Sequence, residues 1–472
     1  MTRCVYFILL IQAMALIGCA RTNEQTILNQ QYKNTCAFFE DLVDYTLTKH
    51  AYWGAEDREH VVKAALKKVQ IELAALPKQK SKLCETIEQT YLAQKKLDEP
   101  TFYRYLISTY LKTLDPHSRY IAPEDVKLEK ADIANRIKKS GVEFYYRNPI
   151  IAKMTSNNPI WIDFVHQQAY PGLEEGFRVT EIQGESILSM NLLRMLDLIS
   201  PHQTYTIVAH DQEFTIDRQK GIFPDVYGKK IIVGGQTVLW IRLVSFTSKV
   251  AKQLIQMISS EDHIDGLVID LRGNHGGLLS EVDILLDYFL PSVRVYEEIS
   301  YQHGGQKEHQ LKHHQQNDTP MVIMIDNESA SASEIFAGSI AVHHRGVLVG
   351  DYSFGKMNSQ KPYMIGEKNG IGGLMYLTES VLIFSDQTTA QWHRLPPHVW
   401  LKDPETSLLS QSKDNVYEFQ YTDAIVPSQS APAWGEENQA SSVWEMETCP
   451  IEKLRDCTHK QVVEYILQSD FL

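Results

Sequence analysis

The sequence predicts a multidomain α+β protein with a helical N-terminal region, a β-rich module, an α/β core and a helical C-terminal tail. Three observations support this prediction. A chain of 472 residues is too long for one hydrophobic core. Apolar residues recur at helical spacing near the N-terminus. In the second half, nearly continuous apolar strands alternate with helical segments, which is typical of a sheet covered by helices.

The composition is that of a globular protein with a surplus of negative charge. Hydrophobic residues make up 43% of the chain, and 46 Lys and Arg against 59 Asp and Glu give a net charge of −13. Because this surplus repels a phosphate backbone, nucleic acid is not expected as a partner. The 17 histidines form no HExxH motif and no paired Cys/His spacing, so we expect no metal and no cofactor.

The N-terminus predicts export. Arg3 precedes an apolar run over 5–18 that is shorter than the roughly 20 residues of a membrane-spanning helix. Residues 1–18 are therefore interpreted as a signal peptide. Residues 16–19 (LIGC) resemble a bacterial lipobox, which implies lipidation of Cys19 and a periplasmic protein of the cell envelope, lipid-anchored to a membrane. The alternative is a plain signal with an incidental cysteine.

Four further cysteines suit an oxidising compartment: Cys36, Cys84, Cys449 and Cys457. Their even number allows three pairings. We expect the disulfides Cys36–Cys84 and Cys449–Cys457, because each would join a terminal helical segment locally. Four unpaired buried thiols are the alternative.

Hydrophobic patterning divides the mature chain into four regions. An N-terminal helical region is expected over 19–115, a β-rich module over 140–222, an α/β core over 230–402 and a C-terminal extension over 403–472. Within the core, strands are predicted at 238–243, 266–271, 293–296, 321–325 and 347–349, and helices at 249–258, 281–290 and 332–343. A last amphipathic helix is predicted near 460–468.

The chemistry-bearing residues follow the core strands. Segment 321–338 (MVIMIDNESASASEIFAG) places serines where a buried strand turns into a helix, and unpaired N–H groups at a helix start can hold an oxyanion. Serines that only cap the helix are the alternative. Segment 270–279 (DLRGNHGGLL) adds a glycine pair that allows close backbone approach, and segment 350–360 (GDYSFGKMNSQ) adds one lysine.

These segments, in this order, resemble the S41 family of serine peptidases, the C-terminal processing or tail-specific proteases. The resemblance covers residues from about 100 to 400 and includes 113–120 (TLDPHSRY), 171–187 (PGLEEGFRVTEIQGESI) and 243–246 (LVSF). It implies a PDZ-like fold for the β-rich module. It also implies a crotonase/ClpP-like α/β peptidase core, to which 100–139 contribute.

The resemblance implies a Ser–Lys dyad. Carried over onto this sequence, Ser331 is the nucleophile, Lys356 the general base and Gln360 a supporting residue that offers the lysine a neutral hydrogen-bond partner. The oxyanion donors would be the backbone N–H groups of Ala332 and of either Gly276 or Gly277, a choice that the repeated glycine leaves open. Two neighbouring serines, Ser329 and Ser333, are expected to cap or pack.

The chain departs from the family pattern at several positions. Val342 replaces an aspartate of the serine helix, and Met357 replaces a glycine after the lysine. The turn of the PDZ-like module is also altered, and its peptide-binding residues would be Gly141, Val142 and Phe144. A spacer or a lid is the alternative role for this module. A Ser-His-Asp arrangement that uses His275 is the alternative catalytic interpretation, and His343 is a further candidate base if Lys356 is not the base.

Two functions follow from the resemblance. The favoured one is a membrane-tethered serine endopeptidase that captures exported proteins by their C-terminal tails, through strand addition, and cleaves near those termini. The alternative is an inactive or weakly active peptide-binding scaffold lipoprotein. A second copy of the chain or an activating adaptor are further partners to consider. A lysine base requires burial away from carboxylates, which lowers the pKa of its amine from about 10.4.

Overall fold

The computed structural model describes most of the chain from residue 35 onward. The described residues are 35–94, 98–126, 142–146, 160–165, 170–174, 177–187, 198, 204–217, 224–312, 316–368, 371–402, 442–445 and 462–464.

A layer of helices forms the N-terminal part. It comprises α2 (Thr35–Leu47), the short 3-10 turn η2 (Ala55–Asp57), α3 (Arg58–Lys68), α4 (Lys80–Gln94) and α5 (Glu99–Leu114). α5 begins after Asp98, whose side chain accepts the backbone N–H of Thr101 at 3.0 Å. Side chains spaced by three and four along these helices, such as Phe39, Leu106 and Tyr110, are fully buried in one shared cluster, as the sequence pattern predicts.

The disulfide Cys36–Cys84 is present and joins α2 to α4, which confirms the predicted pairing. The predicted pair Cys449–Cys457 and the lipidation candidate Cys19 lie outside the described residues.

Loss of the Cys36–Cys84 bridge is expected to lower the free energy of unfolding of the helical layer by roughly 2–4 kcal/mol, because the bridge closes a loop with a sequence separation of 48. Denaturant unfolding of the oxidised protein and of Cys84→Ser, followed by tryptophan fluorescence, measures the difference. Equal midpoints for the two proteins would contradict a stabilising bridge.

The β-rich module is an antiparallel sheet. Its strands are β2 (Val142–Tyr146), β3 (Ile160–Val165), β4 (Arg178–Ile182), β5 (Glu185–Ser186), β6 (Thr204–Ala209) and β7 (Gln212–Asp217). They lie in the order β2-β3-β4-β6-β7, with β5 on β4, so β2 is an edge strand of the described sheet. Alternate residues such as Val179, Ile207 and Ile216 form its buried core.

The α/β core is built on a seven-stranded sheet. Its strands are β8 (Val226–Val233), β9 (Gln236–Leu243), β10 (Gly266–Asp270), β13 (Met321–Ile325), β14 (Val347–Gly350), β17 (Val399–Lys402) and β18 (Ser442–Glu445). The order is β18-β17-β14-β13-β10-β9-β8, and only β8 runs antiparallel to its neighbour. Every residue of β10 and β13 is buried, which explains their continuous apolar pattern.

Helices cover one face of this sheet. They are α9 (Val250–Ser259), α10 (Leu279–Phe289) and α11 (Ala332–Val342), and all three match predicted helices. Leu254, Leu285 and Phe336 pack there against the sheet. On the opposite face, Val462 and Val463 of the C-terminal tail join a cluster with Trp240.

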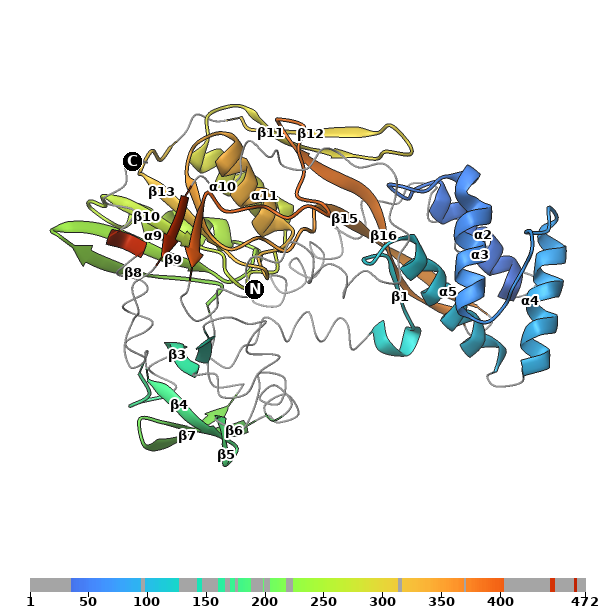
Figure 1. The fold of residues 1–472 in the computed structure, drawn as a ribbon, viewed down its shortest axis with the longest axis horizontal. Helices are drawn as coiled ribbons and strands as arrows, with labels where there is room; N and C mark the ends of the chain where they lie inside the picture. Colours follow the sequence, from blue (N-terminus) through green and yellow to red (C-terminus); the bar gives the residue numbers. More distant parts are fainter. Residues whose placement is uncertain are drawn as a thin grey trace, which may run out of the picture.

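A second sheet links the core to the helical layer. It contains β1 (Arg119–Ile121), β11 (Arg294–Ile299), β12 (Gln306–Gln310), β15 (Asn358–Lys368) and β16 (Ile371–Phe384). The predicted strand 293–296 therefore belongs to this sheet and not to the seven-stranded one. The long hairpin β15–β16 extends from the core toward α2–α5, and its Met375, Leu377 and Val381 enter the core of the helical layer (Figure 1).

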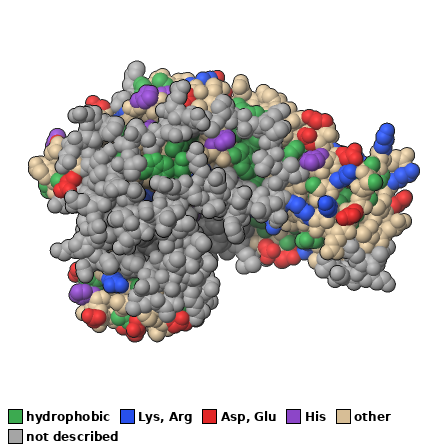
Figure 2. Space-filling view, in the orientation of Figure 1, with side chains coloured by type: hydrophobic (Ala, Val, Ile, Leu, Met, Phe, Trp, Pro, Cys, Tyr) green, Lys and Arg blue, Asp and Glu red, His purple; other side chains and the backbone are tan. Residues whose placement is uncertain are grey.

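The helical layer carries charges of both signs. On the face drawn in Figure 2, basic and acidic side chains are interspersed over this part of the molecule. Ion pairs such as Lys80–Asp41 at 3.0 Å and Arg104–Glu124 at 2.6 Å account for part of this mixture. Exposed pairs of this kind add little stability. Among the described helices, none has the length and apolar content required to cross a bilayer.

Candidate active site

Ser331 lies on a strained turn between β13 and α11. Its φ of 56° is in the left-handed region that non-glycine residues rarely adopt. The residue is partly exposed, whereas Ala330, Ala332 and Ser333 around it are buried. Of the three serines in this segment, Ser331 is therefore the one that a substrate can reach, and it stands at the N-terminus of α11, where backbone N–H groups lack intrahelical partners.

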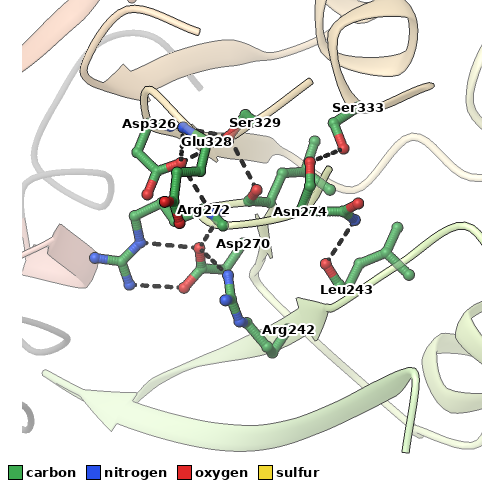
Figure 3. Close-up of polar contacts among 11 residues, drawn as sticks. Arg242, Leu243, Asp270, Arg272, Asn274, Asp326, Glu328, Ser329 and Ser333 are labelled. Carbon is green, nitrogen blue, oxygen red and sulfur yellow. Dashed lines mark hydrogen bonds and ion pairs between the residues drawn. The ribbon is translucent and has the colours of Figure 1, made fainter. Parts of the chain in front are cut away.

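The two neighbouring serines hold the turn together, as the sequence argument expected. The Ser329 hydroxyl donates to the Leu271 carbonyl at 2.9 Å and accepts the backbone N–H of Asp326 at 2.9 Å. The Ser333 hydroxyl donates to the Asn274 carbonyl at 2.8 Å. Both hydroxyls thus tie the serine segment to the loop that follows β10 (Figure 3).

Glu334 joins the serine segment to the lysine segment. One of its carboxylate oxygens accepts the backbone N–H groups of Ser331 at 2.9 Å and of Lys356 at 2.7 Å. The other accepts the Ser353 hydroxyl at 2.6 Å and the Gly355 N–H at 2.5 Å. Burial raises the pKa of this carboxyl, and the four donors oppose that effect by stabilising its ionised form.

Lys356 follows β14 and lies beside this carboxylate. Desolvation lowers the pKa of its amine to about 8, although the charges of Glu334 and Asp115 act in the opposite direction. The sequence-based prediction was an amine with a pKa lowered by burial, at a distance from carboxylates. The direction is as expected, but the two nearby carboxylates differ from the expectation and limit the shift.

Asn358 lies between Gln360 and Lys356 and binds both side chains. The amine of Lys356 donates to the Asn358 carbonyl at 3.0 Å, and the Gln360 amide donates to the Asn358 side-chain oxygen at 2.7 Å. A direct bond between Gln360 and the amine, which the sequence argument envisaged, is replaced by this indirect contact. Gln360 therefore contacts the residue whose carbonyl binds the amine.

The glycine pair lies against Ser331. A Cβ atom on Gly276 would come within 2.9 Å of the Ser331 Cβ and of the Ala332 nitrogen, so only glycine fits there. The Gly276 N–H donates to the Asn274 side chain at 2.9 Å. Gly277 is exposed. The Gly276 carbonyl accepts the Phe246 N–H, and the Leu278 N–H donates to the Phe246 carbonyl. In this parallel bridge the N–H of Gly277 itself points away from Phe246. This geometry favours Gly277 over Gly276 as an oxyanion donor.

Buried polar residues hold the end of β10 in place. The Asp270 carboxylate pairs with Arg272 at 2.7 Å and with Arg242 at 3.2 Å (Figure 3). Asn274 donates to the Leu243 carbonyl at 2.8 Å. These bonds fix the glycine loop relative to β9, and with it the approach to Ser331.

The histidines considered as alternative bases are poorly placed. His343 follows the end of α11, about 18 Å along the helix from Ser331 at its start. His275 is exposed, and within the described part of the chain no hydrogen bond joins it to Ser331. The peptide-binding candidates Val142 and Phe144 lie on β2, whereas Gly141 is outside the described residues.

Comparisons with known proteins agree with this architecture. Residues 237–400 match the model of peptidase family S41. The carboxy-terminal-processing protease of Bartonella bacilliformis is 27% identical over 324 residues, which are 65% of this chain and 71% of that protein. The carboxy-terminal processing protease CtpB of Bacillus subtilis is 26% identical over 308 residues, 62% of each chain.

These matches define the class of the protein as that of the serine-type peptidases. Residues 237–400 carry the match to peptidase family S41, and the two relatives are both carboxy-terminal processing proteases. A solved structure, the photosystem II D1 C-terminal processing protease, is 18% identical and covers 82% of this chain and 96% of its own, with a TM-score of 0.47.

Glu334 was not among the site residues predicted from the sequence. Its signal was present, because serine followed three residues later by glutamate is the capping-box pattern of a helix start. The capping-box pattern identifies a helix start but does not say which other groups the glutamate binds. Its partners in 353–356 are distant in sequence, so only the folded structure reveals the link.

Proposed function

We propose that the protein is a C-terminal processing serine endopeptidase in which Ser331 is the nucleophile and Lys356 the general base. The observation that carries the proposal is the single carboxylate oxygen of Glu334 that binds the backbone N–H groups of both residues. It holds the strained serine and the lysine with the lowered pKa in one rigid unit.

The reaction would proceed in two steps. The Ser331 oxygen attacks the scissile carbonyl while its proton passes to the neutral Lys356 amine, and the N–H groups of Ala332 and Gly277 donate hydrogen bonds to the developing oxyanion. The protonated lysine then gives the proton to the leaving amine, which leaves an acyl-enzyme. Water then attacks the ester carbonyl as Lys356 takes one of its protons. The bond between the acyl carbon and the Ser331 oxygen breaks, Lys356 returns the proton to that oxygen, and the acyl fragment leaves with a new C-terminal carboxylate.

The substrate class follows from the β-rich module and from the relatives. β2 is an edge strand of the described sheet, so an extended chain can add beside it through main-chain hydrogen bonds. The relatives are named for carboxy-terminal processing. We therefore assign PDZ-like capture of a protein's C-terminal tail to this module and cleavage near that terminus to the core.

Capture by the tail is testable with one substrate in two forms. An unfolded protein with a free C-terminus should be cleaved faster than the same protein with an amidated C-terminus, because strand-adding modules hold the carboxylate. Val142→Arg on β2 should slow cleavage of the free form severalfold. Thr215→Arg on the opposite edge strand β7 is the matched control and should not. If neither amidation of the substrate nor Val142→Arg changed the cleavage rate, the module would be a spacer or a lid and not a site that binds the tail.

We further propose that Cys19 carries lipid and tethers the enzyme to a membrane of the bacterial cell envelope, facing the periplasm. Cys19→Ser should then release soluble protein or leave the signal unprocessed, since the anchor would depend on acyl chains. Membrane fractionation and mass measurement of the mature N-terminus check this. Unchanged fractionation and processing in Cys19→Ser would refute the anchor.

A further inference from the structure

A buried chain of hydrogen bonds connects the helical layer to Lys356. It begins at His50, which follows α2 and is fully buried. The His50 Nδ1 accepts the backbone N–H of Tyr52 at 3.1 Å, so Nδ1 carries no proton and Nε2 is the donor. Nε2 donates to the Asp115 carboxylate at 2.8 Å. A residue of the helical layer therefore fixes this carboxylate.

Asp115 shapes the segment that follows α5. Its Oδ1 accepts the backbone N–H groups of His117 at 2.8 Å and of Ser118 at 3.0 Å, and its other oxygen accepts the Ser118 hydroxyl. Burial opposes ionisation, but the hydrogen bond from His50 and the other donors hold the pKa of Asp115 well below its usual range. The carboxylate is thus a fully buried anion, and both of its oxygens accept hydrogen bonds.

Thr378 on β16 binds the Asp115 carboxylate. Its hydroxyl donates to Asp115 Oδ1 at 2.9 Å, and its backbone N–H donates to the Ser118 hydroxyl oxygen at 3.0 Å. Its carbonyl accepts the N–H of Ala51, beside His50, at 3.0 Å. Thr378 of the hairpin thus makes three hydrogen bonds, to Ala51, Asp115 and Ser118, which belong to the helical layer and the segment after it.

The chain ends at the lysine. The Thr378 hydroxyl oxygen accepts the Gln360 amide at 3.2 Å, and these two residues are direct partners in the β15–β16 pairing. Gln360 in turn binds the Asn358 side chain, and the Asn358 carbonyl holds the Lys356 amine. Each link is buried or partly buried, so water competes weakly with it.

Electrostatics couple the same groups. Three charged groups act on the Lys356 amine: Glu334 on α11, Asp115 directly after α5, and Arg119 on β1. Asp115 raises the pKa of Lys356, and Arg119 lowers it. Burial and the charge of Lys356 lower the pKa of His117, in the same segment, to about 4, so this histidine stays neutral at working pH.

We propose that Asp115 is a positioning residue for Lys356, and that His50 and Thr378 hold it in that role. The amine is competent only when the helical layer is docked on the β15–β16 hairpin, because that docking brings His50, Asp115 and Thr378 together. The inference rests on the proposed function, since it assigns these residues to the same Ser331–Lys356 site.

A matched set of threonine variants tests the hydrogen-bond chain. Thr378→Val replaces the hydroxyl with a methyl group of similar shape, and Thr378→Ser keeps the hydroxyl. Thr113→Val is the control, because it makes the same change at a buried hydroxyl that donates to the Thr109 carbonyl in its own helix. We expect kcat of Thr378→Val to fall roughly tenfold with KM within about twofold, because the amine is misplaced. Thr378→Ser should recover most of this loss, and Thr113→Val should turn over as wild type.

A second measurement needs no turnover. The rate at which trace acetic anhydride acetylates Lys356, followed by peptide mass spectrometry across pH, reports the titration of its amine. In Asp115→Asn, loss of the nearby negative charge should lower the midpoint by roughly half a pH unit. A purely structural role would leave the midpoint in place. Circular dichroism and thermal melting establish that each variant is folded.

The outcomes separate this inference from the proposed function. If wild type cleaves no substrate, the proposed function fails and the Lys356 midpoint in Asp115→Asn alone decides the inference. If wild type cleaves, the inference is overturned either by Thr378→Val kinetics equal to those of Thr113→Val or by an unchanged midpoint. A tenfold loss of kcat in Thr378→Val, recovery in Thr378→Ser and a lowered midpoint in Asp115→Asn together support it.

Discussion

Lys356→Met and Lys356→Arg are both expected to lower the turnover number by about 10³-fold. Methionine keeps the length of the side chain but has no basic nitrogen, and arginine stays protonated at all working pH values. General-base catalysis contributes roughly 10²–10⁴-fold to a rate, so its loss should leave little activity. Steady-state cleavage of an unfolded protein measures the effect.

The pH dependence of wild type follows from the same residue. The base acts only when unprotonated, and the pKa of Lys356 is lowered to about 8, so activity should rise with pH and level off above that value. At neutral pH roughly one molecule in ten would carry a neutral amine. A rate profile that rises through pH 6 to 7 would instead indicate a histidine base.

Lys361→Met on β15 is the control for these variants. Lys361 is largely exposed and pairs with Glu379 at 2.6 Å, so its loss should leave turnover unchanged. Substantial turnover in Lys356→Arg would mean that another group accepts the proton.

Glu334→Gln is expected to lower both activity and stability. Glutamine keeps the size of the side chain but offers one acceptor oxygen and an NH2 group where the carboxylate meets four donors. Two buried donors would then face an amide N–H, at a cost of about 2–4 kcal/mol in the free energy of unfolding. Because Ser331 and Lys356 lose their common anchor, kcat should fall by roughly 10²-fold.

Glu281→Gln separates the two effects. Glu281 is also a buried carboxylate and accepts the backbone N–H groups of Lys249 at 2.9 Å and of Ala251 at 3.0 Å at the start of α9. This variant should lose stability and keep kcat. If Glu334→Gln lost stability without losing more activity than Glu281→Gln, Glu334 would be a structural residue only.

The sequence was sufficient for the central parts of the fold. Strands such as 266–270 and 321–325 are apolar throughout because both faces of the sheet are covered, and that pattern is local. The helix after Ser331 and the disulfide Cys36–Cys84 were also predicted, and the structure contains both.

Contacts between distant segments were beyond the sequence. Asp115 was seen only as part of a family-like segment, because its partners His50 and Thr378 lie 65 and 263 positions away. The pairing of β18 with β17 and the insertion of the β15–β16 hairpin into the helical layer were missed for the same reason. Hydrophobic periodicity identifies a strand but does not name its neighbour.

The most direct test of the Ser331–Lys356 assignment compares two serine variants of one helix segment. Ser331→Ala removes the proposed nucleophile, and Ser339→Ala removes a buried hydroxyl of α11 that binds no partner among the described residues. Each protein is incubated with an unfolded substrate, and new peptide termini are identified by mass spectrometry. We expect wild type and Ser339→Ala to produce the same cleavages near the substrate C-terminus and Ser331→Ala to produce none. Cleavage at the wild-type rate by Ser331→Ala would contradict the assignment.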